Sequence, residues 1–173
     1  MIRTADINQE DVTMKKIVIG SDKSGYELKE YIKAHLINIG YEVEDCGTVD
    51  PENGVKGYFV VAPILAEKIS KGEYEKGILV CGTGTGMSIV ANKYPGVYAA
   101  LCRSYSDAKY CRAINNANVM CLGGWITGKD AGVALTNVFL ETEFTQDVED
   151  WRAVNLKNAF AGVQATEKEI YNK

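Results

Sequence analysis

The sequence predicts an α/β protein with a Rossmann-like three-layer α/β/α sandwich and a five-stranded parallel sheet. The main observation is that short apolar runs alternate along the chain with longer stretches whose apolar residues recur at helical spacing. A second observation is that residues 77–81 are uniformly apolar, as in parallel strands that are buried on both faces. Parallel strands need crossover connections, and the helical stretches supply them.

The N-terminal part of the chain is expected to hold two strands with a helix between them. Residues 15–20 form a short apolar strand that enters a Gly-Ser-Asp loop, and the helix at 24–39 stops at Gly40. The second strand is expected at 41–45. A loop at 49–57 follows, because this segment contains Pro, Asn and Gly, which favour turns.

The remaining elements continue this alternation. Helices are expected at residues 58–71, 87–93, 106–114, 130–141 and 148–171, and strands at 77–81, 98–102 and 119–122. In parallel sheets of this kind, ligands bind beyond the C-terminal ends of the strands. This rule places Asp22, the loop at 81–86 and Arg103 around one crevice.

The composition is that of one globular domain with a sizeable core. The chain has 173 residues, of which 46% are hydrophobic, and its net charge of -4 argues against a nucleic-acid partner. No apolar run is long enough to span a bilayer, and the N-terminus lacks a signal-peptide pattern, so we expect a cytoplasmic protein without a membrane partner. Residues 1–13 are expected to be an extension, and residues 14–173 a single domain that ends in a helix.

The numbers of cysteines and histidines narrow the possible chemistry. The five cysteines form no CxxC pair, and their odd number favours reduced thiols over a disulfide framework. The single histidine, His35, lies beside the apolar stripe of an expected helix and is interpreted as structural. One chain therefore cannot build a mechanism that needs two imidazoles, and a zinc site is not expected.

The loop at residues 81–86, Cys-Gly-Thr-Gly-Thr-Gly, is the most informative segment. Glycine at alternate positions lets the backbone approach a ligand, and amides near a helix start can hold an anion. The loop has neither the GK[ST] ending of a Walker loop nor the dinucleotide pattern GxGxxG. Cys81 ends the strand before it, and a thiolate near backbone amides can act as a base or a nucleophile. The alternative is that Cys81 is a small buried hydrophobic residue.

Three segments carry a resemblance to a known family. They are residues 19–22 (Ile-Gly-Ser-Asp), residues 77–93, which include the glycine-rich loop, and residues 115–119 (Asn-Asn-Ala-Asn-Val). In this order they resemble the ribose-5-phosphate isomerase B and galactose-6-phosphate isomerase family, and the match covers about residues 14–145. The resemblance implies that an open-chain aldose is converted to a ketose by moving a proton between C2 and C1 through an enediolate, without a metal or a cofactor.

The resemblance also implies roles for individual residues. Cys81 would remove the carbon-bound proton, and Thr83 would handle the hydroxyl and carbonyl protons. The amides of Gly82, Gly84 and Gly86 would stabilise the enediolate oxygen as its charge develops. The expected substrate-binding set as a whole is Lys23, Gly82, Gly84, Gly86, Met87, Ser88, Arg103, Asn115 and Arg152.

Other interpretations stay open for several of these residues. Asp22, the third expected catalytic residue, would hold sugar hydroxyls or help to open the ring, or it caps the helix at Ser24. Thr83 either takes part in the reaction or satisfies loop amides. Three aromatic residues either line a sugar pocket or make ordinary packing contacts: Trp125, Tyr105 and Tyr58.

Four positions depart from the ribose-type pattern that the resemblance implies. Lys23 stands where the family usually has His, and Ile114 replaces the His that assists ring opening. Of two phosphate-binding arginines only the second is kept, as Arg152, because the first falls at Val148. An Arg usually found after the fifth strand falls at Trp125. We therefore expect that the chain opens a cyclic sugar poorly or uses a substrate that cannot cyclise.

The B-type subunit of galactose-6-phosphate isomerase resembles this chain at three places. It also has an apolar residue at position 114, an Arg at position 103 and a run like residues 123–128. The resemblance implies that the partner of that subunit supplies the missing His and Arg groups.

The main hypothesis is an isomerase of a small sugar phosphate of the ribose 5-phosphate type. It would be active as a homo-oligomer, dimer or tetramer, with active sites at the interface. The alternatives are a chain that needs a paralogous subunit, and a non-catalytic sugar-phosphate-binding protein. Lys23 and Arg103 would together neutralise a phosphate or carboxylate, or are two solvated charges.

Overall fold

The computed structural model describes residues 15–172. Its centre is a parallel sheet of five strands in the order β2-β1-β3-β5-β4, which confirms the expected sheet. The strand order changes direction between β1 and β3, and ligands bind at such a switch point in open α/β sheets. The strands are β1 (Lys16–Ser21), β2 (Glu42–Asp45), β3 (Gly77–Cys81), β4 (Ala99–Leu101) and β5 (Val119–Gly123).

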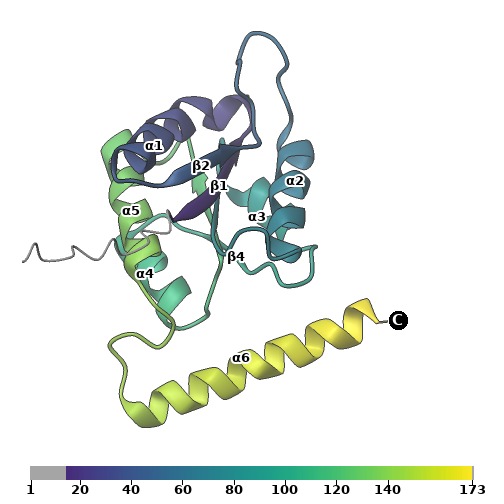
Figure 1. Cartoon of the computed structure of the whole chain (residues 1–173), viewed down its shortest axis with the longest axis vertical. Helices are drawn as coiled ribbons and strands as arrows, with labels where there is room; N and C mark the ends of the chain where they lie inside the picture. The colour runs from purple at the N-terminus through teal and green to yellow at the C-terminus, as the bar shows by residue number, and fades with distance from the viewer. Residues whose placement is uncertain (1–14, 173) are drawn as a thin grey trace, which may run out of the picture.

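Helices cover both faces of the sheet. One layer holds α1 (Tyr26–Asn38), α4 (Tyr105–Ala113) and α5 (Lys129–Glu141), and the other holds α2 (Tyr58–Ser70) and α3 (Thr85–Ala91) (Figure 1). A separate hydrophobic cluster fills the space between the sheet and each layer. The three-layer sandwich predicted from the sequence is therefore confirmed.

Strand β3 shows why a continuous apolar run was a reliable strand signal. Ile78 and Val80 pack toward the layer of α1, α4 and α5, whereas Leu79 and Cys81 pack toward α2 and α3. Ile78, Leu79 and Val80 are each 0% exposed, and burial of one such side chain contributes about 1.5–3 kcal/mol. The alternation also directs Cys81, the last residue of the strand, toward the α3 side of the sheet.

Several helix starts differ by one or two residues from the expected boundaries, and two of them have a clear local cause. The helix expected from residue 24 is preceded by a 3-10 turn, η1 (Lys23–Gly25), because the side chain of Asp22 caps that turn. The helix expected from residue 87 begins two residues earlier, as α3, because Gly84 adopts a φ of 78° and turns the chain directly into the helix.

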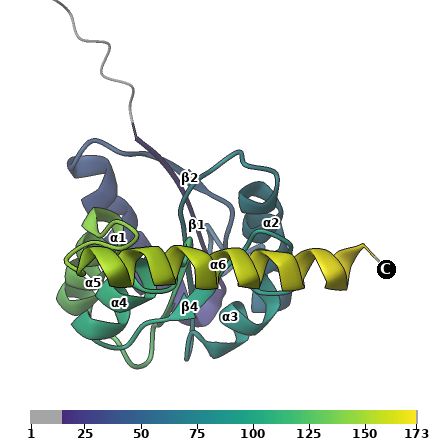
Figure 2. The ribbon, with the colours of Figure 1, turned by 90° about the horizontal axis from the view of Figure 1, so that it is seen from below.

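The last helix, α6 (Asp150–Tyr171), crosses the molecule at the N-terminal ends of the strands (Figure 2). The carboxylate of Glu167 attaches it to the sheet by accepting hydrogen bonds from the amide of Gly96 at 2.8 Å and from the hydroxyl of Tyr98 at 3.2 Å. No residue of α6 is buried. Several of its large apolar side chains are more than half exposed, namely Trp151, Val154, Val163 and Ile170.

The extension expected at residues 1–13 lies outside the described residues. Between residues 15 and 172, the structure contains no helix with the length and apolar character that a membrane span requires.

Candidate active site

Backbone hydrogen bonds join three strand ends at the C-terminal edge of the sheet. The amide of Asp22, which follows β1, donates to the carbonyl of Val80 at 3.3 Å. The amide of Gly124, which follows β5, donates to the carbonyl of Cys81 at 2.7 Å. The ends of β1, β3 and β5 are therefore tied together at this edge, where Asp22 and Cys81 lie.

Cys81 lies almost completely buried at the end of β3, with 5% of its surface exposed. Its Sγ accepts a hydrogen bond from the amide of Gly84 at 3.1 Å. A donor aimed at sulfur stabilises a thiolate more than a thiol, because the accepting atom then carries the charge. The local geometry therefore suits a sulfur base, although Cys81 also packs in the cluster beneath α2 and α3.

Two aromatic rings lie against glycines of this loop. A Cβ on Gly82 would come within 2.8 Å of the Trp125 ring, and a Cβ on Gly86 would lie 3.0 Å from the Tyr58 ring. The backbone of Trp125 is fixed as well, because its amide donates to the carbonyl of Gly82 at 3.0 Å. Trp125 and Tyr58 thus pack on the loop from two sides, and each glycine leaves the space that its ring fills.

Thr83 and Asp22 each make the local hydrogen bond that the simpler interpretation predicts. Thr83 is exposed, and its Oγ1 accepts a hydrogen bond from the amide of Thr85 at 3.4 Å. Asp22 Oδ1 accepts one from the amide of Gly25 at 3.0 Å. Burial raises the pKa of the Asp22 carboxyl above its ordinary value, because the charged form loses hydration. The roles of both residues toward a substrate stay predictions.

Two cations lie at the ends of strands near this loop. Lys23 follows Asp22, and its Nζ is 4.0 Å from a carboxylate oxygen of Glu52, with both side chains more than half exposed. Arg103 follows β4 and is exposed, and its amide donates to the carboxylate of Asp107 at 2.9 Å. Exposed ion pairs contribute little to stability, so Lys23 can exchange Glu52 for an anionic ligand at small cost.

Two of the predicted substrate-binding side chains point elsewhere. Met87 is 0% exposed in the cluster under α2 and α3, so its backbone is the part that can face a ligand. Ser88 turns toward β4, where its Oγ donates to the carbonyl of Ala99 at 3.3 Å. These side chains fix α3 in place, and any contact that they make with a substrate stays a prediction.

The last two predicted residues lie on different sides of the molecule. Asn115 is exposed just after α4, next to the half-buried Ile114. Arg152 is exposed on α6, at the N-terminal ends of the strands. Within one chain Arg152 and Cys81 therefore lie at opposite ends of the strands, and the predicted role of Arg152 toward a substrate stays a prediction.

Sequence reasoning missed a buried ion network beside the site. Lys29 on α1 is 0% exposed, and its Nζ lies 2.6 Å from a carboxylate oxygen of Asp45 and 2.7 Å from the carbonyl of Thr48. The amide of Thr48 donates in turn to the carbonyl of Ser21 at 2.8 Å. The network therefore holds the loop after β2 against the end of β1. The available signal was a lysine within the apolar stripe of the expected helix.

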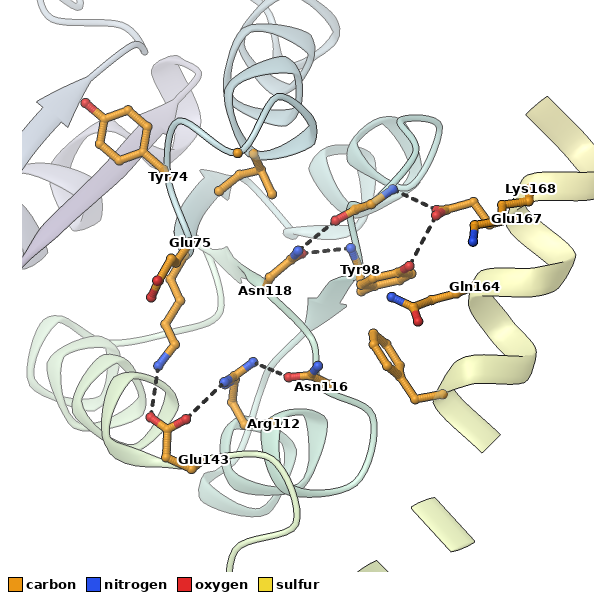
Figure 3. A pocket seen from close by; sticks show the side chains of 15 residues that line it. Tyr74, Glu75, Tyr98, Arg112, Asn116, Asn118, Glu143, Gln164, Glu167 and Lys168 are labelled. Atoms are coloured by element: carbon orange, nitrogen blue, oxygen red, sulfur yellow. Dashed lines mark hydrogen bonds and ion pairs between the residues drawn. The ribbon is translucent and has the colours of Figure 1, made fainter. Parts of the chain in front are cut away.

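A cavity of about 560 Å³ lies at the opposite end of the sheet, between the segments that precede β3, β4 and β5 and helix α6 (Figure 3). Arg112 lines it, but its guanidinium already donates to the carbonyls of Ala117 at 2.6 Å and Thr142 at 3.2 Å. None of the residues predicted for catalysis lines this cavity. The glycine-rich loop at the C-terminal strand ends is the better candidate for the active site.

Comparisons with known proteins show which family the chain belongs to. The chain matches the family model described as Ribose/Galactose Isomerase over residues 17–156. It is 54% identical over 158 residues to the 4-deoxy-4-sulfo-D-erythrose isomerase of Clostridium sp. (strain MSTE9), with 91% of this chain and 99% of that protein covered. It is 38% identical to galactose-6-phosphate isomerase subunit LacB of Clostridium acetobutylicum, with 74% of this chain and 73% of that protein covered.

A solved structure extends the likeness to three dimensions. The ribose-5-phosphate isomerase B of Clostridium thermocellum matches with a TM-score of 0.80 and 36% sequence identity, over 90% of this chain and 99% of that chain. The family match begins in β1 and ends within α6, so it contains all five strands and the glycine-rich loop. The chain therefore belongs to the ribose/galactose isomerase family, and it is an aldose–ketose isomerase.

Proposed function

We propose that this enzyme converts 4-deoxy-4-sulfo-D-erythrose, a four-carbon aldose with a terminal sulfonate, to the corresponding 2-ketose. The observation that carries the proposal is the 54% identity to an isomerase of that name, over 99% of that protein's length. The identities to the phosphate-sugar relatives are lower, for example 37% to ribose-5-phosphate isomerase B of Escherichia coli. A sugar phosphate is therefore the second substrate class to test.

The chemistry of this sugar agrees with the loss of the ring-opening histidine. An aldotetrose closes its five-membered ring through the hydroxyl on C4, and in the sulfonated sugar that hydroxyl is replaced by sulfur. The hydroxyl on C3 could close only a strained four-membered ring. The substrate therefore stays open, and an enzyme for it needs no acid to open a ring. Ile114, which cannot carry a proton, is compatible with such a substrate.

The proposed reaction moves one proton from C2 to C1. Cys81, as the thiolate, takes the proton from C2, and the electron pair of that C–H bond forms the C1–C2 double bond of an enediolate. Thr83 passes a proton between the oxygens on C1 and C2, and the loop amides stabilise the negative oxygen. The Cys81 thiol exchanges its hydrogen with solvent and then gives a proton to C1. The hydrogen bond from Gly84 supports this cycle, because it lowers the energy of the thiolate at the start and at the end.

The sulfonate needs cations at the end of the site far from the aldehyde. Lys23 and Arg103 are exposed cations at the neighbouring strand ends, and Lys23 forms an exposed pair with Glu52 at 4.0 Å. A second copy of the chain can add Arg152, because that residue lies exposed on α6. We accordingly propose a homo-oligomer in which each active site lies at a subunit interface.

The test is an assay of the purified protein, without any other subunit, in deuterated water. Four substrates are compared by NMR: 4-deoxy-4-sulfo-D-erythrose, D-erythrose 4-phosphate, ribose 5-phosphate and galactose 6-phosphate. The expected result is fast formation of the sulfonated ketose with deuterium at C1. Preference for a phosphorylated sugar would overturn the sulfonate assignment, and no ketose from any of the four would overturn catalysis by this chain alone.

A second candidate is a subunit that needs a paralogous partner. The observation that favours it is the likeness to the LacB subunit together with the apolar residue at position 114. It predicts that the chain alone is inactive with all four sugars and becomes active when it is mixed with a paralogue that carries the histidine. Full activity of the purified chain alone would rule it out.

A further inference from the structure

Two cysteines outside the active site lie close enough to react with each other. The Sγ atoms of Cys102 and Cys111 are 3.8 Å apart. Cys102 directly follows β4, and Cys111 lies on α4, which covers that strand end. The proposed isomerisation uses neither thiol, and neither takes part in a disulfide in this structure.

The sheet separates this pair from the other cysteines. Cys102 and Cys111 belong to the hydrophobic cluster on the side of α1, α4 and α5. Cys46, Cys81 and Cys121 belong to the cluster on the opposite face. The reactive partner of Cys111 within the chain is therefore Cys102, and oxidation of this pair leaves the catalytic sulfur untouched.

The two thiols differ in exposure and in local contacts. Cys102 is 0% exposed, whereas Cys111 is partly exposed, with its Sγ 3.4 Å from the carbonyl of Ala108 on its own helix. The hydrogen bond between the two sulfurs raises the pKa of Cys102 and lowers that of Cys111. The neighbouring positive charge of Arg112 also lowers the pKa of Cys111. The more accessible thiol is thus the one that ionises more readily, as attack on an oxidant requires.

We propose that Cys102 and Cys111 are a reversible disulfide site that responds to low-molecular-weight disulfides and weakens the binding of the anionic end of the substrate. In the first step the Cys111 thiolate attacks the small disulfide RSSR, which forms a Cys111–S–SR bond and releases RS⁻. In the second step Cys102 attacks Cys111 Sγ, which forms the protein disulfide and releases RSH. The two protein thiols give up two electrons, and RSSR is reduced to two RSH.

The expected effect on binding follows from the position of the pair. Arg103 is the next residue after Cys102, and its amide is already held by Asp107 in the first turn of α4. A disulfide draws the strand end and α4 together at residues 102 and 111, because the sulfur atoms must approach from 3.8 Å to about 2.05 Å. Arg103 moves with its neighbour. This second part of the inference rests on the proposed function, in which Arg103 contacts the sulfonate.

The experiment treats the purified protein with 2-hydroxyethyl disulfide and then analyses its thiols and its kinetics. Of the five thiols, two are expected to be lost when free thiols are counted in denaturant. The tryptic peptides 94–103 and 110–112 are expected to be joined by a disulfide. Dithiothreitol should restore all five thiols. On oxidation, the KM for 4-deoxy-4-sulfo-D-erythrose is expected to rise about threefold or more, and kcat should stay nearly unchanged. This rise is smaller than that expected for full loss of a charge-assisted contact, because Arg103 is displaced and not removed.

Matched variants separate this site from the other thiols. Cys111→Ser should lose both the linked peptides and the KM change, whereas Cys46→Ser should keep both. If Cys102→Ser does not fold, the partly exposed Cys111 variant still decides the question. Unlinked peptides would overturn the disulfide site whatever the substrate is. A linked pair with an unchanged KM would overturn the effect of the disulfide on substrate binding. The same rise in KM in Cys111→Ser after oxidation would overturn it too.

Discussion

The amide of Gly84 points at the sulfur of Cys81, at a donor–acceptor distance of 3.1 Å. Gly84 is also the N-cap of α3, where a φ of 78° turns the chain into the helix. The same residue therefore shapes the loop and stabilises the proposed base. This relationship leads to predictions about both residues.

Replacement of Cys81 by alanine is expected to lower kcat by at least about 100-fold, because the reaction then lacks the group that takes the proton from C2. The measurement is the rate of deuterium incorporation at C1 of the product. Cys81→Ser is the matched control, since it keeps the size of the side chain and offers a weaker base. Its rate should lie between those of the wild type and the alanine variant. An alanine variant with the wild-type rate would remove Cys81 from the mechanism.

Replacement of Gly84 by alanine is expected to reduce both stability and activity. The new Cβ would lie 2.6 Å from Leu101 and 2.9 Å from the backbone of Leu122, in addition to the strain of a positive φ. Gly54→Ala is the matched control, because Gly54 has a φ of 79° and no heavy atom within 4 Å of the added Cβ. The control should lose only about 1 kcal/mol of unfolding free energy, and Gly84→Ala should lose about 1–3 kcal/mol more. Denaturant unfolding measures both, and equal losses would contradict the crowding argument.

The ion network beneath the site should appear in the pH dependence of stability. Burial opposes ionisation of Asp45, but hydrogen bonds from Lys29 and Lys33 outweigh it and hold the pKa of its carboxyl below the ordinary 3.8. A lowered pKa means that Asp45 stabilises the fold above about pH 4 and loses this effect as the pH falls through its folded value. Asp45→Asn should therefore be less stable than the wild type at pH 7, and the difference should shrink in acid.

The size of the Asp45 effect distinguishes this buried pair from a surface pair. The side chain of Lys29 is 0% exposed and pairs with Asp45 at 2.6 Å and Glu30 at 2.7 Å, so removal of the Asp45 charge is expected to lower the unfolding free energy at pH 7 by about 3 kcal/mol. Glu67→Gln is the control, because the pair of Glu67 with Lys71 is more than half exposed on both sides and should be nearly neutral. A loss for Asp45→Asn that does not change between pH 7 and pH 3 would contradict the assigned ionisation.

A histidine at position 114 is expected to broaden the substrate range. Ile114 is the C-cap of α4 and is half-buried next to Asn115. The imidazole of Ile114→His would supply a proton carrier for ring opening, so activity with ribose 5-phosphate should rise by about tenfold or more. Activity with the open-chain sulfonated tetrose should change little. Ile114→Asn, which is polar but does not titrate, is the control. If Ile114→Asn gains as much activity with ribose 5-phosphate, the gain does not come from proton transfer in ring opening.

The fold could be predicted because its signals are local. Strand β3 is apolar throughout since both of its faces are covered, and its expected bounds, residues 77–81, agree with the structure. The strands end in loops whose positions follow from the parallel order, so Asp22 and Cys81 were expected at the same edge of the sheet. In the structure the amide of Asp22 donates to the carbonyl of Val80, the residue before Cys81.

The missed features depend on contacts between residues distant in the sequence. No local pattern shows that the Trp125 ring lies against Gly82, because the contact depends on how the loops after β3 and β5 are paired. Lys29 was expected only as part of a helix, since its partners come from β2 and the following loop. The position of Arg152 is set by the path of the chain to α6, which no periodicity determines.

The anion site should respond to the removal of each cation. A charge-assisted contact contributes about 1.5–3 kcal/mol, so Lys23→Met and Arg103→Met should each raise the KM for the sulfonated tetrose about 10- to 100-fold. The same variants should have little effect on D-erythrose, which has no terminal anion. Arg152→Met should behave in the same way if a second copy supplies Arg152. Lys157→Met is the control on the same helix, because Lys157 is also exposed on α6.

The assignment of Arg152 to a neighbouring subunit has its own measurement. When Cys81→Ala and Arg152→Met chains are mixed and allowed to exchange subunits, a site that combines Cys81 of one chain with Arg152 of the other can be wild type at both positions. The mixture should therefore recover activity at low substrate concentration that neither variant has alone. The two intact residues lie at opposite ends of the strands in a single chain, so only a shared site can combine them. Activity that stays at the average of the two separate variants, with subunit exchange shown by mass spectrometry, would place the whole anion site within one chain and leave Lys23 and Arg103 as its cations.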